Sequence, residues 1–211
     1  MPIPVRPWRQ LTVWLHVLTS VGWLACAAVL LVLLLHGEPG AAHVVDTVLL
    51  AALANGSACT GLVLSCGTAW GLVVHRWVLA KFAITVVQLA AGIFLLSGAL
   101  TAAATTGHAP VVLLAGTAVM AALIALQAWL SVAKPGPRTR WGVDRATGRP
   151  VKLPTAPGWV FVLGVTAPVA DLVLTAVLGF PSPFVQVVAL TVVVLARRSA
   201  VRGRAPRAVA A

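Results

Sequence analysis

Long apolar stretches, several of them more than 20 residues long, restrict this chain to a small set of folds. A helix needs about 20 mostly apolar residues to cross the hydrocarbon core of a bilayer. Turn-forming residues, as in HGEPGAAH at 36–43 and TTGHAP at 105–110, separate the stretches. We therefore predict an all-α, polytopic transmembrane helix bundle with six spans, at residues 11–35, 44–66, 78–100, 110–132, 158–180 and 184–196.

The predicted spans divide the chain into two membrane-embedded parts. Residues 1–133 hold a four-helix transmembrane domain, and residues 158–197 hold a C-terminal transmembrane hairpin. A basic loop at 134–157 joins them, and a basic tail at 198–211 is expected to be disordered. The sixth stretch is the shortest and lies near the lower length limit of about 17 residues for a span.

The distribution of basic residues predicts the orientation in the membrane. With the N-terminus in the cytoplasm and six alternating helices, all 15 lysines and arginines of the chain fall on the cytoplasmic side. This is the positive-inside pattern of membrane proteins, and it places both termini inside. We therefore expect a multi-pass protein of a bacterial cytoplasmic membrane.

The composition excludes other classes of protein. Hydrophobic residues make up 60% of the chain and charged residues only 9%, whereas about 25% is usual for soluble domains. The net charge of +11 does not indicate nucleic-acid binding, because the basic residues lie between apolar stretches or at the chain ends. Cys26, Cys59 and Cys66 lie inside apolar stretches without metal-site spacing and are interpreted as small buried residues.

Three polar residues at a similar depth in the cytoplasmic half suggest a binding site. Lys81 lies about one turn into the third span, on a polar face with Thr85 and Gln88, and His16 and Gln127 lie about as deep in the first and fourth spans. A polar face in a membrane helix usually lies toward the protein interior or a water-filled cavity. The alternatives are a lysine that extends to the interface and polar contacts that only join helices.

Other polar residues lie nearer the middle of the predicted spans. Asn55 and Gln88 are interpreted as interior polar contacts, most simply interhelical hydrogen bonds. Asp171 follows Pro168 in the fifth span, and a carboxylate there is expected to pair with a cation or to be protonated. We favour a functional role for Asp171, because an ionisable residue inside a membrane marks a functional site more often than not.

No catalytic motif and no metal site is evident. His36, His43 and His108 are predicted to lie on two outer loops, with a spacing that matches no known metal motif. The basic loop and tail would attract anionic lipid headgroups, so the expected partners are the lipid bilayer and anionic lipids.

Three segments resemble the bacterial membrane family catalogued as domain of unknown function 2269. They are LHVLTSVGWLA at 15–25, TGLVLSCGTAWGLVVHRWVLAKF at 60–82 and LSVAKPGPRTRWG at 130–142, so the resemblance covers about residues 11–142. Where that family usually has a proline in its second helix, this chain reads ANGSAC. The biochemical function of the family is not established, so the resemblance implies a fold rather than an activity.

A more distant resemblance concerns His16 and the WxxxK pattern that ends at Lys81. Both are similar to features of copper-resistance D-type membrane proteins and of the small bacterial membrane protoporphyrinogen oxidase, which implies haem or porphyrin binding by His16 and Lys81. The later predicted spans contain no histidine, so a haem between two histidines would need His75 in the adjoining loop.

Two functional hypotheses follow from the sequence. The first is a small non-enzymatic bundle with a binding, transport-accessory or structural role that uses Asn55, Lys81, Gln88, Gln127 and Asp171 as interior contacts. The second is a haem- or copper-associated membrane redox protein that uses His16 and Lys81.

Overall fold

A computed structural model describes residues 3–144, 147–151, 153–179 and 182–202, with side chains up to residue 199. Within these ranges the chain is an all-α bundle without strands, as predicted. The helices are α1 (Val5–Leu35), α2 (Pro39–Val45), α3 (Ala51–Gly67), α4 (Arg76–Ala91), α5 (Ser97–Thr106), α6 (Val111–Ala133), α7 (Gly158–Leu178) and α8 (Phe184–Arg202). The part of the predicted tail at 203–211 lies outside the described residues.

Two π-helical turns join short helices into long rods. Asp46–Leu50 connects α2 to α3, and Gly92–Leu96 connects α4 to α5. Among the described residues, five rods are then long and apolar enough to cross a membrane: Val5–Leu35, Pro39–Gly67, Arg76–Thr106, Val111–Ala133 and Gly158–Leu178. They contain the first three predicted spans and nearly all of the fourth and fifth, whereas α8, at the position of the sixth, is not among them.

The second rod corrects one prediction from the sequence. Pro39 starts α2, so His43 lies within a helix and not on a loop. Proline is favoured at the first position of a helix because its missing N–H would have no helical partner there. The sequence HGEPGAAH was interpreted as a turn, but only the part before Pro39 forms one.

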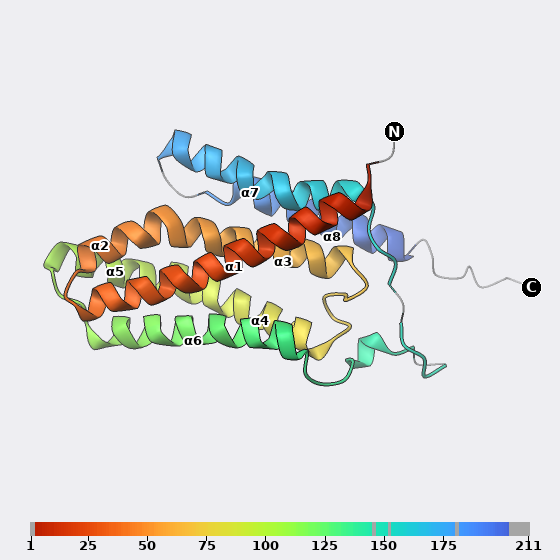
Figure 1. The fold of residues 1–211 in the computed structure, drawn as a ribbon, viewed down its shortest axis with the longest axis horizontal. Coiled ribbons are helices and arrows are strands. Elements are labelled where there is room, and N and C mark those ends of the chain that lie inside the picture. Colours follow the sequence, from red (N-terminus) through yellow and green to blue (C-terminus); the bar gives the residue numbers. More distant parts are fainter. Residues whose placement is uncertain (1–2, 145–146, 152, 180–181, 203–211) are drawn as a thin grey trace, which may run out of the picture.

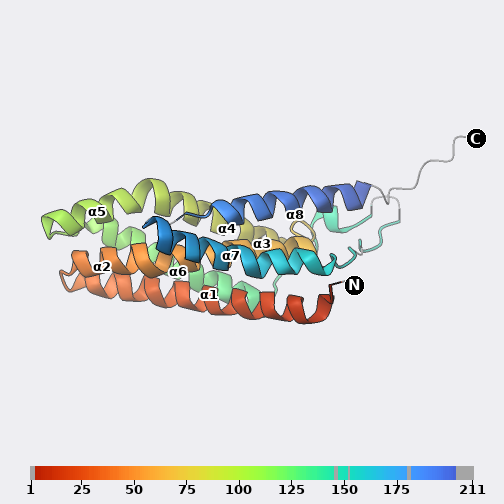
Figure 2. The same cartoon turned by 90° about the horizontal axis from the view of Figure 1, so that it is seen from above.

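The rods lie side by side, with α7 and α8 against one side of the first four (Figures 1 and 2). The start of α1, the end of α8 and the loop after α6 lie at the same end of the bundle (Figure 1). We call this end the basic end, because the described arginines and lysines gather there, and the opposite end the far end. The C-terminal pair packs mainly on α1 and α3.

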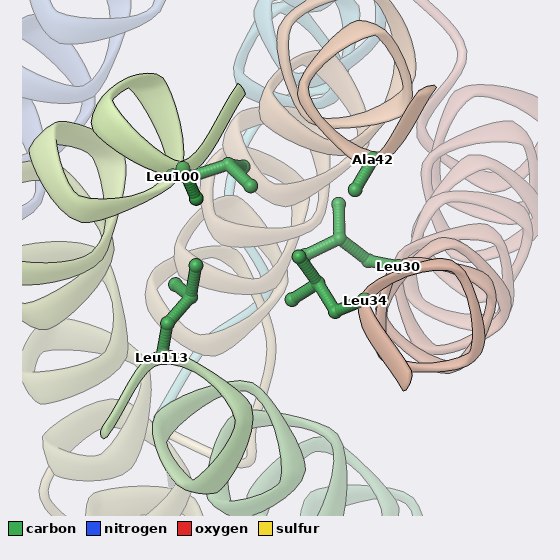
Figure 3. Close-up of a cluster of buried hydrophobic side chains, with 6 residues drawn as sticks. Leu30, Leu34, Ala42, Leu100 and Leu113 are labelled. Atoms are coloured by element: carbon green, nitrogen blue, oxygen red, sulfur yellow. The ribbon is translucent and has the colours of Figure 1, made fainter. Parts of the chain in front are cut away.

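Three buried apolar clusters hold the bundle together. At the far end, side chains from α1, α2, α5 and α6 meet in one cluster (Figure 3), with members Leu30, Leu34, Ala42, Leu100, Ala103 and Leu113. Midway, Trp23 and Ala27 of α1 pack with Ala54 of α3 and Ile124 of α6. Toward the basic end, the third cluster joins α7 and α8 to α3, with Phe161 and Val63 fully buried.

Close approach of α7 to the bundle depends on a glycine. A Cβ atom added to Gly164 would lie 2.8 Å from Val63 Cγ1 of α3 and 3.2 Å from Thr12 Cγ2 of α1. The same face of α7 contacts α1 through the Thr12 hydroxyl, which donates to the Phe161 carbonyl at 3.2 Å. Small residues allow helices to pack this closely in membranes, where tight van der Waals contact drives helix association.

Asp171 holds the beginning of α8. The buried carboxylate accepts hydrogen bonds from the backbone N–H of Val185 at 2.9 Å and of Gln186 at 2.8 Å. These N–H groups belong to the first turn of α8, where a helix lacks internal partners and carries partial positive charge. The sequence suggested a cation or a proton for this carboxylate, and the structure adds a helix N-terminus as its partner.

The position of Asp171 shows how the two helices of the predicted hairpin are offset. At 1.5 Å per residue, Asp171 lies about 20 Å along α7 from Gly158, so α8 begins well inside the bundle and not level with the end of α7. Helix α8 exists as predicted and continues to Arg202, beyond the predicted limit of the span. Most of the predicted turn FPSPF at 180–184 cannot be compared, because residues 180–181 lie outside the described ranges.

Asp171→Asn should destabilise the protein by about 3 kcal/mol. The amide oxygen of asparagine would replace only one of the two carboxylate oxygens, and its NH₂ group would face a backbone N–H of α8. Thermal unfolding of the purified protein in detergent measures the effect. Thr166→Val is the matched control on α7, since its exposed hydroxyl bonds only within its own helix. An unchanged melting temperature for Asp171→Asn would contradict the assigned role.

Candidate functional site

A cavity of about 730 Å³ lies in the half of the bundle nearer the basic end, between α1, α3, α4 and α6. We call it the basic-end cavity. Its walls are mostly apolar, and its polar side chains include His16, Ser20, Lys81, Thr85, Gln127 and Ser131. Ligand sites typically have this size and this combination of apolar walls with a few polar groups.

The cavity arises because the helices separate toward the basic end. The clusters that join α1 to α6 begin at Trp23 and continue to the far end. Figure 1 shows α1 and α6 diverging toward the N-terminal end of α1. Helix α4 likewise makes few contacts with α3, whereas α5 packs against α2.

His16 projects from α1 onto α3. Its Nδ1 lies 3.1 Å from the Ser57 carbonyl and 3.0 Å from Thr60 Oγ1. A carbonyl can only accept, so Nδ1 carries a proton and the neutral ring has its lone pair on Nε2. Gly61 leaves room for the ring, because a Cβ there would lie 3.0 Å from His16 Cε1. The imidazole is therefore fixed in orientation beside the cavity.

Lys81 lies on the opposite wall. Its Nζ donates to Ser131 Oγ of α6 at 2.5 Å, and Ser131 Oγ donates in turn to the Gln127 carbonyl at 2.9 Å. The four acidic residues of the chain are Glu38, Asp46, Asp144 and Asp171, and none of them lines the cavity. Lys81 therefore faces the cavity without a counter-ion among its lining residues.

Gln127 and Gln88 are joined in one hydrogen-bonded chain between α4 and α6. Thr85 Oγ1 donates to Gln127 Oε1 at 2.9 Å, Gln127 Nε2 donates to Gln88 Oε1, and Gln88 Nε2 donates to the Met120 carbonyl at 3.0 Å. Both glutamine side chains are buried. The polar face predicted on the third span is thus the contact surface of α4 with α6.

A second cavity, of about 420 Å³, lies toward the far end. Asn55, Gln88 and Asp46 line it, together with residues of both π-helical turns. Trp23 and Leu89 border both cavities, so these two side chains separate the basic-end cavity from the far-end cavity. Asn55 is thus placed apart from His16 and Lys81, and so is Asp171, which lines neither cavity.

The other histidines do not reach the site. His75 Nδ1 bonds the Trp70 carbonyl at 2.8 Å, and its ring lies 5.5 Å from the Trp70 ring, outside the cavity lining. His36 Nδ1 lies 2.8 Å from the Val32 carbonyl. In the part of the chain that the structure describes, no three His, Cys, Asp or Glu residues are placed to share a metal ion.

Sequence reasoning missed the serines and threonine that hold the two ionisable side chains. Ser57 and Thr60 orient His16, and Ser131 contacts Lys81. Ser57 and Thr60 lie in the run ANGSACTG, and the sequence alone does not indicate a partner for either hydroxyl group. Finding Ser131 would have required the register between α4 and α6, which helical periodicity alone does not provide.

No protein-family model, curated protein or solved structure matches this chain.

The Gln88–Gln127 hydrogen bond should give a measurable coupling energy. In a double-mutant cycle with Gln88→Leu and Gln127→Leu, we expect about 0.6 kcal/mol and at most about 1.7 kcal/mol, the values found for hydrogen bonds between membrane helices. Thermal unfolding of the four proteins in detergent measures it. A second cycle that pairs Gln88→Leu with Gln186→Leu is the control, because Gln186 lies on α8. Equal coupling in both cycles would contradict the assigned contact.

Proposed function

We propose that this protein is a non-enzymatic membrane protein that binds a small molecule in the basic-end cavity. The observation that carries the proposal is one cavity lined by both His16 and Lys81 and by none of the chain's acidic residues. Lys81 contacts an anionic or hydrogen-bond-accepting group of the ligand, and His16 Nε2 is a second polar contact. The apolar walls surround the rest of the ligand.

The proposed location follows from the basic residues. We place the protein in a bacterial cytoplasmic membrane with the basic end in the cytoplasm, in accord with the positive-inside rule. The cavity then lies in the cytoplasmic leaflet. The resemblance to the domain of unknown function 2269 family supports a bacterial membrane origin. Arginines of the basic loop and tail would hold the basic end against anionic lipid headgroups.

A substitution that obstructs the cavity should remove the ligand. Ala128 and Ala125 are both exposed on α6, but only Ala128 lines the basic-end cavity. We expect a stoichiometric compound in organic extracts of the purified wild-type protein and of Ala125→Phe, and its loss from Ala128→Phe. Mass spectrometry of the three extracts measures this. If none of the three proteins retains a compound above the level of an unrelated membrane protein, binding in this cavity is not its function.

Haem is the second candidate ligand, and the orientation of His16 favours it. Ligating histidines usually donate their other ring N–H to a carbonyl or carboxylate, as His16 Nδ1 does to Ser57. His16 would hold the iron and Lys81 a carboxylate of the porphyrin, and haem would supply one-electron chemistry. His16 is the only histidine that lines the cavity, so ligation by two histidines is not supported. Among the described residues, no three His, Cys, Asp or Glu side chains are placed to hold a copper ion.

An absorption spectrum of the purified protein with added haemin tests this candidate. Haem ligated by His16 would give a sharp band that shifts on reduction, is lost in His16→Ala and persists in His75→Ala. A spectrum unchanged by either substitution would exclude ligation by His16.

A further inference from the structure

We infer that the ligand of the basic-end cavity is a single-chain amphiphile with an anionic headgroup, which enters sideways from the membrane. This inference rests on the proposed function and specifies its ligand. It is carried by the side opening, the length and the charge of the cavity.

The cavity has an opening that faces lipid. Val13, Val17 and Val21 of α1 line it and are 45%, 55% and 62% exposed, and Val86 of α4 is 49% exposed. These apolar side chains lie on helices long enough to cross a membrane, so their exposed surfaces contact acyl chains and not water. Because α1 and α6 separate here, a lipid-like molecule can enter without leaving the apolar phase.

The length of the cavity fits one leaflet. Its lining on α1 extends from Arg9 to Leu24, which is about 22 Å at 1.5 Å per residue. One leaflet contributes about 15 Å of hydrocarbon, and its headgroups add several ångströms. The cavity therefore reaches from the headgroup region to the middle of the bilayer.

The volume favours one chain over two. Pockets of about 300–1,000 Å³ hold drug-sized ligands, and a fatty acid with about 20 heavy atoms belongs to that class. A two-chain phospholipid is about twice as large or more, whereas this cavity measures about 730 Å³. The dimensions therefore indicate a single acyl chain.

The charges indicate where each end of the ligand lies. Arg9 lies at the basic end of the lining on α1, Lys81 lies five residues after Arg76, the first residue of α4, and the lining contains no acidic residue. At the other end the lining is apolar, with Trp23, Leu89 and Ile124. An anionic headgroup would therefore lie between Arg9 and Lys81, with the tail toward Trp23. A cationic or uncharged headgroup would leave Lys81 without a counter-ion in an apolar region, which is unfavourable.

Binding of radiolabelled oleate to the full-length protein in detergent tests the inference. We expect saturable, one-to-one binding that unlabelled oleate displaces and that oleylamine and oleyl alcohol displace at least tenfold less well. Lys81→Met should weaken oleate binding about tenfold or more, because a charge-assisted contact is lost. Lys134→Met is the matched control, since Lys134 is exposed, lies over Trp70 and does not line the cavity.

Three outcomes would overturn the inference. Equal displacement by oleate, oleylamine and oleyl alcohol would mean that the headgroup is not recognised. Equal weakening by Lys81→Met and Lys134→Met would mean that oleate responds only to overall charge. Stronger displacement by dioleoylphosphatidylglycerol than by oleate would mean that the site takes a two-chain lipid. In each case, the loss of an extracted compound from Ala128→Phe alone would still support the proposed function. The inference about the ligand and the proposed function can therefore fail separately.

Discussion

The packing of Trp23 against Ile124 midway along the bundle is the contact on which the rest of the structure depends. Trp23 is 4% exposed and packs with Ala27, Ala54 and Ile124, so α1, α3 and α6 are held together at this level. A buried tryptophan contributes a large contact area and is stiff, because it has only two side-chain torsions. Toward the basic end α6 diverges from α1, whereas α3 stays in contact with α1 through His16. The same cluster therefore closes the bundle on one side and leaves a cavity on the other.

The polar residues of the bundle fall into two groups with different physical roles. Gln88, Gln127 and Thr85 satisfy one another between α4 and α6, and such contacts stabilise helix packing without requiring a ligand. Lys81 is hydrogen-bonded only to the Ser131 hydroxyl, which does not neutralise its charge, and His16 uses only Nδ1 in its contacts with Ser57 and Thr60. The side chains of the first group satisfy one another's hydrogen bonds. His16 and Lys81 line the cavity and can still contact a bound molecule.

Much of the fold could be predicted from the sequence because hydrophobic length is a strong signal. The five stretches that form the long rods were found from apolar runs and turn residues. Their predicted ends differ from the observed helix ends by a few residues. His43 was misplaced because a proline after a glycine-containing turn can equally begin a helix. The partners of Asp171 were missed because they are backbone N–H groups 14 and 15 residues later, and no side-chain pattern reveals those.

The candidate site was only partly predictable. The similar depth of His16, Lys81 and Gln127 could be estimated by counting residues from the helix ends, and the structure places all three around one cavity. Depth does not determine which helices are neighbours, so the contact of His16 with α3 and of Lys81 with α6 required the structure. Whether helices separate or stay in contact depends on packing along their whole length, and sequence periodicity does not contain that information.

The start of α8 has a consequence for how the protein is made. The N–H groups of Val185 and Gln186 bond to the carboxylate of Asp171, and the carboxylate gains those two donors only from α8. Either helix entering the bilayer alone would bring an unsatisfied polar group with it. Helices α7 and α8 should therefore leave the translocation machinery and enter the lipid as one preassembled pair, after synthesis has passed the arginines at the end of α8.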